Sequence, residues 1–262
     1  MSNEAEETPV HAPLPIKTFI TSVARIEQLA HPFTRITFRG GDLAHFRSIG
    51  PDQFLYLLLP PTGRKDLTID AAFEWSQYQA MPESEQPIGA YYTVRHHRPD
   101  VTELDIDIVK HGHEGQVGTW LKQAGPGDPV ALWGPRMAYA PPPSTQRQLL
   151  IGDETALPAI ASILDAGPIG ARVDAIVELD PDTVLDLPEL RGLTINRLDG
   201  PEAHQSKLPA ALRGWTLNEA DYVWGAGEFD LMRELKSYLR DCLGMPAEQV
   251  SMVGYWRRNP QP

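Results

Sequence analysis

The first candidate for chemistry is the run Tyr92-Thr93-Val94-Arg95, which places an aromatic ring, a hydroxyl and a guanidinium close together. β-Branched and aromatic residues favour a pleated strand, and Gly89 lies just before this one. Successive side chains of a strand point to opposite faces, so Tyr92 and Val94 share one face and Arg95 lies on the other. Such a strand could hold a flat ring, a sugar-like chain and a phosphate. A barrel strand with an exposed arginine is the alternative.

A second candidate is a glycine-rich passage from a strand into a helix. Glycines at positions 112, 115 and 118 leave the backbone uncovered, and Thr119 adds a hydroxyl. Free N–H groups at a helix N-terminus, with the helix dipole, form a phosphate site that needs no lysine. An ordinary glycine-rich turn is the alternative. His111 and His113 are two residues apart, but no carboxylate–histidine spacing supports a metal site.

Two further glycine turns follow short apolar strands in the second half of the chain. They are Gly152-Asp153-Glu154-Thr155-Ala156 and Gly225-Ala226-Gly227-Glu228, each ahead of a predicted helix. In α/β domains, ligands bind at the carboxyl ends of parallel strands, where such turns lie. The first turn lacks the G-x-G-x-x-G fingerprint. Asp153 and Glu154 could be a catalytic pair, although carboxylates ahead of a helix are more often caps.

The last predicted strand ends in aromatic and basic residues, Gly254-Tyr255-Trp256-Arg257-Arg258. Aromatic rings and guanidinium groups together can cover a flat ligand or attract an anionic one. A solvated basic end is an equally good interpretation of this segment.

These candidates depend on two kinds of element. Short strands separated by turns fill the first half, which predicts a small antiparallel barrel. The strands expected there are 18–26, 34–38, 53–59, 89–95, 103–109 and 129–133, with short helices near 71–78 and 118–124. Beyond a proline-rich linker at 141–145, strands and helices alternate, which predicts a parallel α/β domain. The strands expected there are 148–152, 172–178, 194–198, 222–225 and 250–255, with helices at 156–165 and 229–243.

We therefore predict a flexible tail at residues 1–15, a barrel domain at 16–143 and an α/β domain at 144–262. The formal net charge of −12 argues against general binding to a nucleic-acid backbone. Cys242 is the single cysteine, which excludes intrachain disulfides, Cys-ligated iron–sulfur clusters and cysteine-rich zinc sites. No apolar run reaches the ~18–20 residues that span a bilayer, and no signal peptide is evident. We expect a cytoplasmic protein, monomeric by default.

Taken in order, these segments resemble the siderophore-interacting protein family, flavin-dependent ferric-siderophore reductases of the ferredoxin-reductase-like superfamily. The matching segments are Tyr92–Arg95, His111–Trp120, Pro126-Gly127-Asp128, Gly134-Pro135-Arg136, Gly152–Ile160, Ala226-Gly227-Glu228 and Gly254–Arg257. The strings Gly-Asp-Glu-Thr-Ala-Leu-Pro-Ala and Gly-Tyr-Trp-Arg are the most specific of them.

The resemblance implies an N-terminal antiparallel Greek-key β-barrel that binds FAD noncovalently. It also implies a parallel-sheet α/β domain that binds NADH or NADPH. The nucleotide would deliver a hydride to the flavin, and electrons would pass to a ferric siderophore to release Fe(II). The protein would supply orientation, with no general acid, general base or resident metal required. Trp256 is a candidate cover for the ring face where the nicotinamide enters.

The resemblance also assigns residues to each ligand. The FAD contacts are Tyr92, Thr93, Val94, Arg95, His111, Gly112, Gly115, Val117, Gly118 and Thr119. The NAD(P)H contacts are Gly152, Asp153, Glu154, Thr155, Ala156, Gly225, Ala226, Gly227 and Glu228. The anionic ferric siderophore would meet Arg64, Lys65, Arg136, Arg257 and Arg258. The siderophore class and the choice between NADH and NADPH stay open, with Arg197 as a candidate contact for a 2′-phosphate.

One position departs from the family pattern. Family members usually carry an arginine two residues before the motif tyrosine, where this chain has Ala90. Losing a charge-assisted phosphate contact costs about 1.5–3 kcal/mol, or about ten- to hundredfold in affinity. Arg95 or another cation compensates, FAD is held more loosely, or the chain has another role. Two other functions therefore stay open, a general NAD(P)H:flavin or quinone reductase and a non-catalytic siderophore- or flavin-binding protein.

Overall fold

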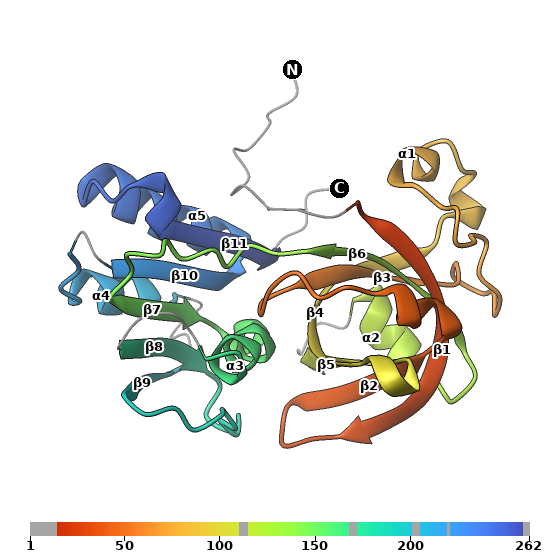
Figure 1. Ribbon diagram of the computed structural model, residues 1–262, viewed down its shortest axis with the longest axis horizontal. Helices are drawn as coiled ribbons and strands as arrows, with labels where there is room; N and C mark the ends of the chain where they lie inside the picture. The colour runs from red at the N-terminus through yellow and green to blue at the C-terminus, as the bar shows by residue number, and fades with distance from the viewer. Residues whose placement is uncertain (1–14, 110–114, 168–171, 201–204, 219–220, 259–262) are drawn as a thin grey trace. The chain divides into compact units, whose positions relative to one another are not determined.

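The computed structural model describes residues 15–109, 115–167, 172–200, 205–218 and 221–258 (Figure 1). These residues form two compact units that divide between Met137 and Ala138. Each unit has its own sheet and its own apolar core. No helix in the described part of the chain is both long enough and apolar enough to cross a membrane.

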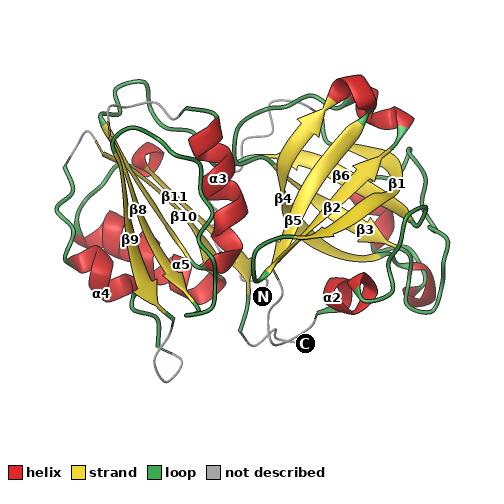
Figure 2. Cartoon of the chain, turned by 90° about the horizontal axis from the view of Figure 1, so that it is seen from below, coloured by secondary structure: helices red, strands yellow, loops and turns green. Residues whose placement is uncertain are grey.

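The first unit is a closed six-stranded barrel in which every neighbouring pair of strands is antiparallel (Figure 2). Its strands are β1 (Lys17–Gln28), β2 (Phe33–Arg39), β3 (Phe54–Leu59), β4 (Ile88–Arg98), β5 (Glu103–Val109) and β6 (Pro129–Arg136). The order around the barrel is β1-β2-β5-β4-β3-β6, so β5 inserts between β2 and β4. The predicted antiparallel Greek-key barrel is confirmed.

Alternating apolar residues form the barrel core. Ile36 and Phe38 on β2 and Leu104 and Ile106 on β5 are fully buried, while the residues between them face outward. Two short helices accompany the strands, α1 (Trp75–Tyr78) and α2 (Gln116–Leu121). Helix α2 begins two residues before the predicted start, because Gly115 is already its extended N-cap residue.

The second unit is a five-stranded parallel sheet with helices, as predicted. Its strands are β7 (Arg147–Gly152), β8 (Arg172–Leu179), β9 (Leu193–Asp199), β10 (Asp221–Glu228) and β11 (Val250–Trp256). Its helices are α3 (Leu157–Asp165), α4 (Leu208–Arg213) and α5 (Phe229–Ser237). The order β11-β10-β7-β8-β9 reverses direction between β7 and β10. That reversal is the topological switch point at which open α/β sheets bind ligands.

The helix predicted over 229–243 is wrong in its second half. Helix α5 ends at Ser237, and a π-helical turn follows over Tyr238–Cys242. The Leu243 N–H donates to the Tyr238 carbonyl at 3.1 Å, which closes the wider i→i+5 ring. The wider turn changes the helical register, and Cys242 at its end is exposed. Helix α4 has no counterpart in the prediction.

Candidate functional site

Strand β4 carries the predicted flavin motif, and its two halves have different neighbours. Along one edge it pairs with β3 over residues 88–93. Along the other edge it pairs with β5 only from Val94 to Arg98. Among the described residues, no strand pairs with residues 88–93 on that second side. The motif therefore lies where the barrel wall opens and backbone groups can serve a ligand.

The inner face of this open half is apolar and aromatic. Ala90, Tyr92 and Val94 all pack against the barrel core, together with Trp120 and Leu121 of α2. Tyr92 and Val94 therefore share a face, as the strand pattern predicts. Burial raises the pKa of the Tyr92 hydroxyl above its usual range, so the ring stays neutral. A neutral, half-buried aromatic ring beside an open strand edge is suited to contact a flat ligand.

A β-bulge at Arg95 changes the second half of β4. Val94 pairs with Ile106 of β5, but His96 pairs with the very next β5 residue, Asp105, so Arg95 is an extra residue. Beyond the bulge, His97 turns inward, with its ring 4.8 Å from that of Phe46 in an edge-to-face contact. Burial lowers the pKa of His97.

The predicted end of this strand is wrong by three residues. The sequence predicts a strand that ends at residue 95 and a connection over residues 96–100. It instead continues to Arg98, and Pro99–Val101 form the turn.

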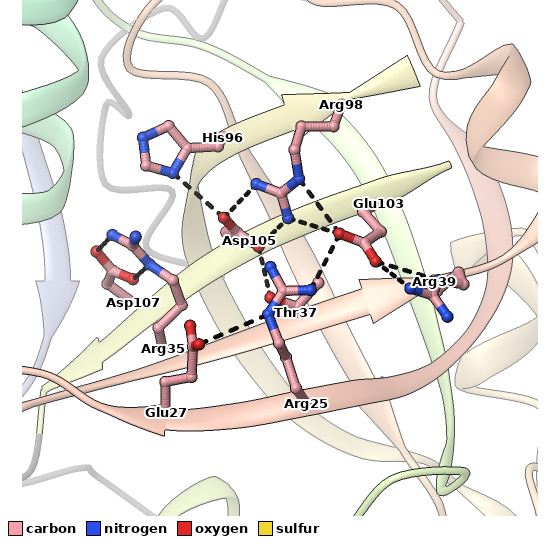
Figure 3. Close-up of polar contacts among 10 residues, drawn as sticks. All are labelled: Arg25, Glu27, Arg35, Thr37, Arg39, His96, Arg98, Glu103, Asp105 and Asp107. Atoms are coloured by element: carbon pink, nitrogen blue, oxygen red, sulfur yellow. Dashed lines mark hydrogen bonds and ion pairs between the residues drawn. The ribbon is translucent and has the colours of Figure 1, made fainter. Parts of the chain in front are cut away.

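The outer face of the second half is a ladder of arginines and carboxylates (Figure 3). Direct cross-strand pairs join Arg35 to Asp107, Thr37 to Asp105 and Arg39 to Glu103. The Arg35 guanidinium binds Asp107 through Nε at 2.7 Å and Nη2 at 2.8 Å. We call this set the charged ladder; it comprises Arg25, Glu27, Arg35, Thr37, Arg39, His96, Arg98, Glu103, Asp105 and Asp107.

Two carboxylates of the charged ladder, Glu103 and Asp105, are buried and ionised. Asp105 accepts hydrogen bonds from both Nη atoms of Arg98 at 2.6 Å and from the Thr37 hydroxyl at 2.7 Å. Burial opposes its charge, but hydrogen bonds from Arg98, His96 and Thr37 outweigh burial and hold the pKa of Asp105 well below its usual range. Burial likewise opposes ionisation of Glu103, yet three arginines lower its pKa to about 2. These groups satisfy one another, so the ladder is built to stabilise the barrel.

Arg95 faces this charged side and not the Ala90 side. It lines a shallow pocket of about 550 Å³ with residues of the charged ladder and His97. Ala90 packs inward against the core. The structure therefore does not bring Arg95 to the position vacated by the motif arginine.

The predicted phosphate segment lies partly within the described chain. His111 and Gly112 fall outside the described residues. Gly115 caps α2, and Val117 is buried beneath it. The Thr119 N–H donates to the Gly115 carbonyl at 3.0 Å, so it serves the helix. The N–H groups of residues 116–118 have no partner within the helix and are the donors that remain for an anion.

The outer face of the open half is aromatic, and it contains one predicted substrate residue. Tyr91 is 43% exposed, and its ring stands edge-to-face against Tyr56 at 4.7 Å and Phe54 at 5.5 Å. The Arg136 guanidinium lies 4.1 Å from the Trp133 ring centroid and 5.4 Å from that of Tyr91. Sequence reasoning missed Tyr91. Its only signal was its alternation with Tyr92.

The other predicted substrate residues lie in the loop after β3 and at the end of β11. Arg64 and Lys65 lie exposed in the loop after β3. In the α/β unit, the Arg257 guanidinium stacks 3.5 Å from the Phe229 ring centroid. The Arg258 N–H donates to Glu228 at 3.3 Å.

In the α/β unit, the two predicted glycine turns meet at the switch point. Gly152 ends β7 and pairs with Ala226 on β10. A Cβ at Gly152 would collide with the Ala226 carbonyl oxygen, and one at Gly227 would lie 2.7 Å from the Asp153 carboxylate. Gly227 also has a φ of +154°, which other residues rarely adopt. Both positions therefore require glycine, and they keep the backbone uncovered where ligands of this fold bind.

Side chains around these turns are held in fixed positions. Asp153 accepts a hydrogen bond from the Thr155 N–H at 2.9 Å and another from the Trp256 indole at 2.8 Å. Glu228 caps α5 by accepting from the Leu231 N–H at 2.9 Å. Asp153 and Glu228 are therefore caps rather than free acid or base groups.

Glu154 and Arg197 also bind nearby backbone. Glu154 accepts from the Asp180 N–H, and burial raises its pKa. Arg197 donates to the carbonyls of Thr183, Asp180 and Pro181, so it braces a loop. Around all of these sites, the described residues contain no cluster of three or more potential metal ligands.

Each of the two units matches the model of a known protein family or domain. The barrel unit matches the siderophore-interacting FAD-binding domain over residues 22–139. Residues 145–259 match the siderophore-interacting protein family model. An uncharacterized protein of Mycobacterium tuberculosis is 33% identical over 208 residues, which cover 74% of this chain and 71% of that protein. The chain belongs to the siderophore-interacting protein family.

Other members are similar over almost the whole of this siderophore-interacting protein. The ferric vibriobactin reductase ViuB of Vibrio cholerae is 26% identical and covers 98% of this chain and 93% of its own length. The crystal structure of a siderophore utilization protein from T. fusca has a TM-score of 0.79 with 26% identity, covering 97% of both chains. The resemblance seen in the motifs is therefore confirmed.

Proposed function

We propose that this siderophore-interacting protein is an FAD-dependent NAD(P)H:ferric-siderophore reductase. One structural observation carries the proposal, the open edge of β4 beside Tyr92 in a unit that matches a siderophore-interacting FAD-binding domain. The similarity to a protein named ferric vibriobactin reductase, along nearly the full chain, supports the reaction.

The residues around the open edge fit a flavin. Tyr92 offers a neutral ring. The backbone of residues 88–93 offers hydrogen-bonding groups along the edge of β4 that does not pair with β5. Residues 116–118 of α2 would hold the diphosphate through their N–H groups. When bound, FAD supplies the chemistry that takes a hydride from the nicotinamide and gives single electrons to iron. The protein's part is to bind, orient and exclude water, so no side chain needs to move a proton.

The nucleotide would bind at the switch point of the α/β unit. Gly152 and Gly227 leave uncovered backbone at the carboxyl ends of β7 and β10. Trp256, fixed by Asp153, would line the nicotinamide side. Since Arg197 already serves three backbone carbonyls, we assign it no role in choosing NADPH over NADH.

The ferric siderophore would be attracted by cations. Arg136, already stacked on Trp133, is the residue whose surroundings best support this role. Arg64, Lys65, Arg257 and Arg258 are further proposed contacts. Because the whole chain has a net charge of −12, a local cationic site would focus its field on an anionic chelate.

An anaerobic absorbance experiment tests the proposal. We expect the FAD-loaded protein to be yellow, to bleach with NADH or NADPH, and to regain its absorbance when a ferric siderophore is added, with Fe(II) appearing in a chromogenic trap. Protein that gains no flavin absorbance from added FAD would refute both enzyme functions. Bleaching that no ferric chelate reverses would indicate a general flavin or quinone reductase instead.

A further inference from the structure

The loop between β3 and β4, residues 60–87, folds back onto the outer face of the barrel. Leu132 of β6 points into the barrel core, so its neighbour Trp133 lies on the outer face. There Trp133 forms a separate apolar cluster that includes Phe73 of the loop. The Thr18 hydroxyl of β1 donates to the Phe73 carbonyl at 2.7 Å, which fixes the loop to the barrel.

Four side chains of this loop and of β6 form a continuous series of face contacts. The Trp75 ring is stacked on that of Tyr78, with centroids 4.7 Å apart and an interplanar angle of 5°. It is also stacked on Trp133, at 5.0 Å and 28°. The Arg136 guanidinium lies 4.1 Å from the centroid of the Trp133 ring. Trp133 is only 8% exposed, so its neighbours almost enclose the ring.

The series connects the loop to the cation that is proposed to attract the ferric chelate. An arginine side chain has many rotamers, and ordering it on binding costs affinity. A guanidinium that already lies over an indole ring loses less freedom, and tryptophan is the best aromatic partner for a cation. The indole of Trp133 must itself be held in one orientation for this to work, and Trp75 packs against it.

We propose that Trp75 is a positioning residue for Arg136. By holding the Trp133 ring, Trp75 orders the guanidinium that meets the anionic chelate. The proposal rests on the proposed reductase function and adds to it a residue that lies outside the matched motifs. A Trp75 that only stabilised the barrel would have no effect on anion binding through Arg136, so the two roles can be separated.

The experiment measures how gallium(III) citrate, an anionic and redox-inert chelate, binds to the FAD-loaded protein. Calorimetric affinities are compared for the wild type, Trp75→Leu, Arg136→Gln and the double variant. We expect Trp75→Leu to weaken binding about three- to tenfold, the size of coupling that is common between neighbouring side chains. In the Arg136→Gln protein, Trp75→Leu should have no further effect, because the guanidinium that Trp75 orders is absent.

Two further variants separate positioning from stability. Phe73→Leu removes a ring from the same apolar cluster, where Phe73 meets Trp75 edge-on with centroids 6.5 Å apart and an interplanar angle of 82°. We expect Phe73→Leu to lower the melting temperature, as Trp75→Leu does, and to leave the affinity for gallium citrate unchanged. Trp75→Phe keeps an aromatic face toward Trp133 and should retain most of the wild-type affinity.

Several results would overturn the proposal. They are an unchanged affinity in Trp75→Leu, an equal loss in Phe73→Leu, a loss that persists in the Arg136→Gln protein, or a wild type that does not bind gallium citrate. If Trp75→Leu does not fold, Tyr78→Leu removes the outer ring of the series and should weaken binding with the same dependence on Arg136. Because gallium is not reduced, an Arg136-dependent effect of Trp75 in a protein that reduces no ferric chelate would reject the proposed reductase alone.

Discussion

The two halves of β4 show how one strand can serve stability and ligand binding at the same time. From Val94 to Arg98 the strand pairs with β5, and His96 and Arg98 bind buried carboxylates of that strand. From residue 88 to 93 it pairs with β3 instead, and its side chains are aliphatic, aromatic or small. The bulge at Arg95 marks the change.

A ligand is expected at the half of the strand whose polar groups have fewer partners within the barrel. Polar side chains that bind partners on neighbouring strands stabilise the fold. They are then not available to bind a ligand, even where their residue types are common in active sites. The charged ladder contains histidine, aspartate and glutamate, but its described side chains bind one another (Figure 3). The open half has fewer ionisable groups, yet it has a backbone edge that β5 does not pair with and the exposed ring of Tyr91.

The largest expected effect is on the charged ladder. Asp105→Ala should lower the free energy of unfolding by about 3–5 kcal/mol, because it leaves Arg98 without its main buried partner. The matched control is Glu234→Ala, which removes an ion pair with Arg213 in which both side chains are 53% exposed, and should cost about 0–1 kcal/mol. Thermal or denaturant unfolding measures both. Equal effects would show that the ladder does not hold the barrel together.

The next effect concerns the open half. Ala90→Arg should tighten FAD binding about ten- to hundredfold, by restoring a charge-assisted contact to the diphosphate on the side of Tyr92. Ala90→Met is the control of similar bulk without charge and should not tighten binding. Fluorescence titration with FAD measures all three proteins. An Arg variant that binds FAD no better than the wild type would show that the diphosphate lies elsewhere.

A smaller effect is expected on the stability of the fold at low pH. The folded pKa of Glu103 is about 2, below its ordinary value of 4.5. Since the folded pKa is the lower one, this carboxylate stabilises the fold fully above pH 4.5, and the contribution is lost as the pH falls toward 2. The wild-type melting temperature should therefore fall more steeply over that window than that of Glu103→Gln. Parallel pH profiles would contradict the assigned pairing of Glu103 with its arginines.

Much of the fold could be predicted from the sequence, because its signals are local. The alternation in residues 34–38 and 103–109 indicates strands with one buried face, and the glycine turns after 152 and 225 mark the carboxyl ends of parallel strands. The bulge at Arg95 could not be predicted. The residues that follow it, His96, His97 and Arg98, have no apolar–polar contrast to show that the alternation has shifted.

The candidate site was less predictable, because its neighbours are distant in sequence. The shared face of Tyr92 and Val94 follows from alternation and is confirmed. That Tyr91 would meet Phe54, Tyr56 and Arg136 depends on β3 and β6 lying beside one another and on their register. The Arg95 side chain faces a pocket on the charged side, which only the bulge determines. The flavin and nucleotide contacts themselves stay predictions.

Hydrogen–deuterium exchange with and without FAD tests whether the open half of β4 and helix α2 hold the flavin. We expect FAD to slow exchange of the backbone amides in residues 88–93 and 115–121, on the open half of β4 and on α2. We expect little change in residues 33–39 and 103–107, which carry most of the charged ladder. Protection confined to those ladder strands, or no protection anywhere in the barrel unit at saturating FAD, would contradict it.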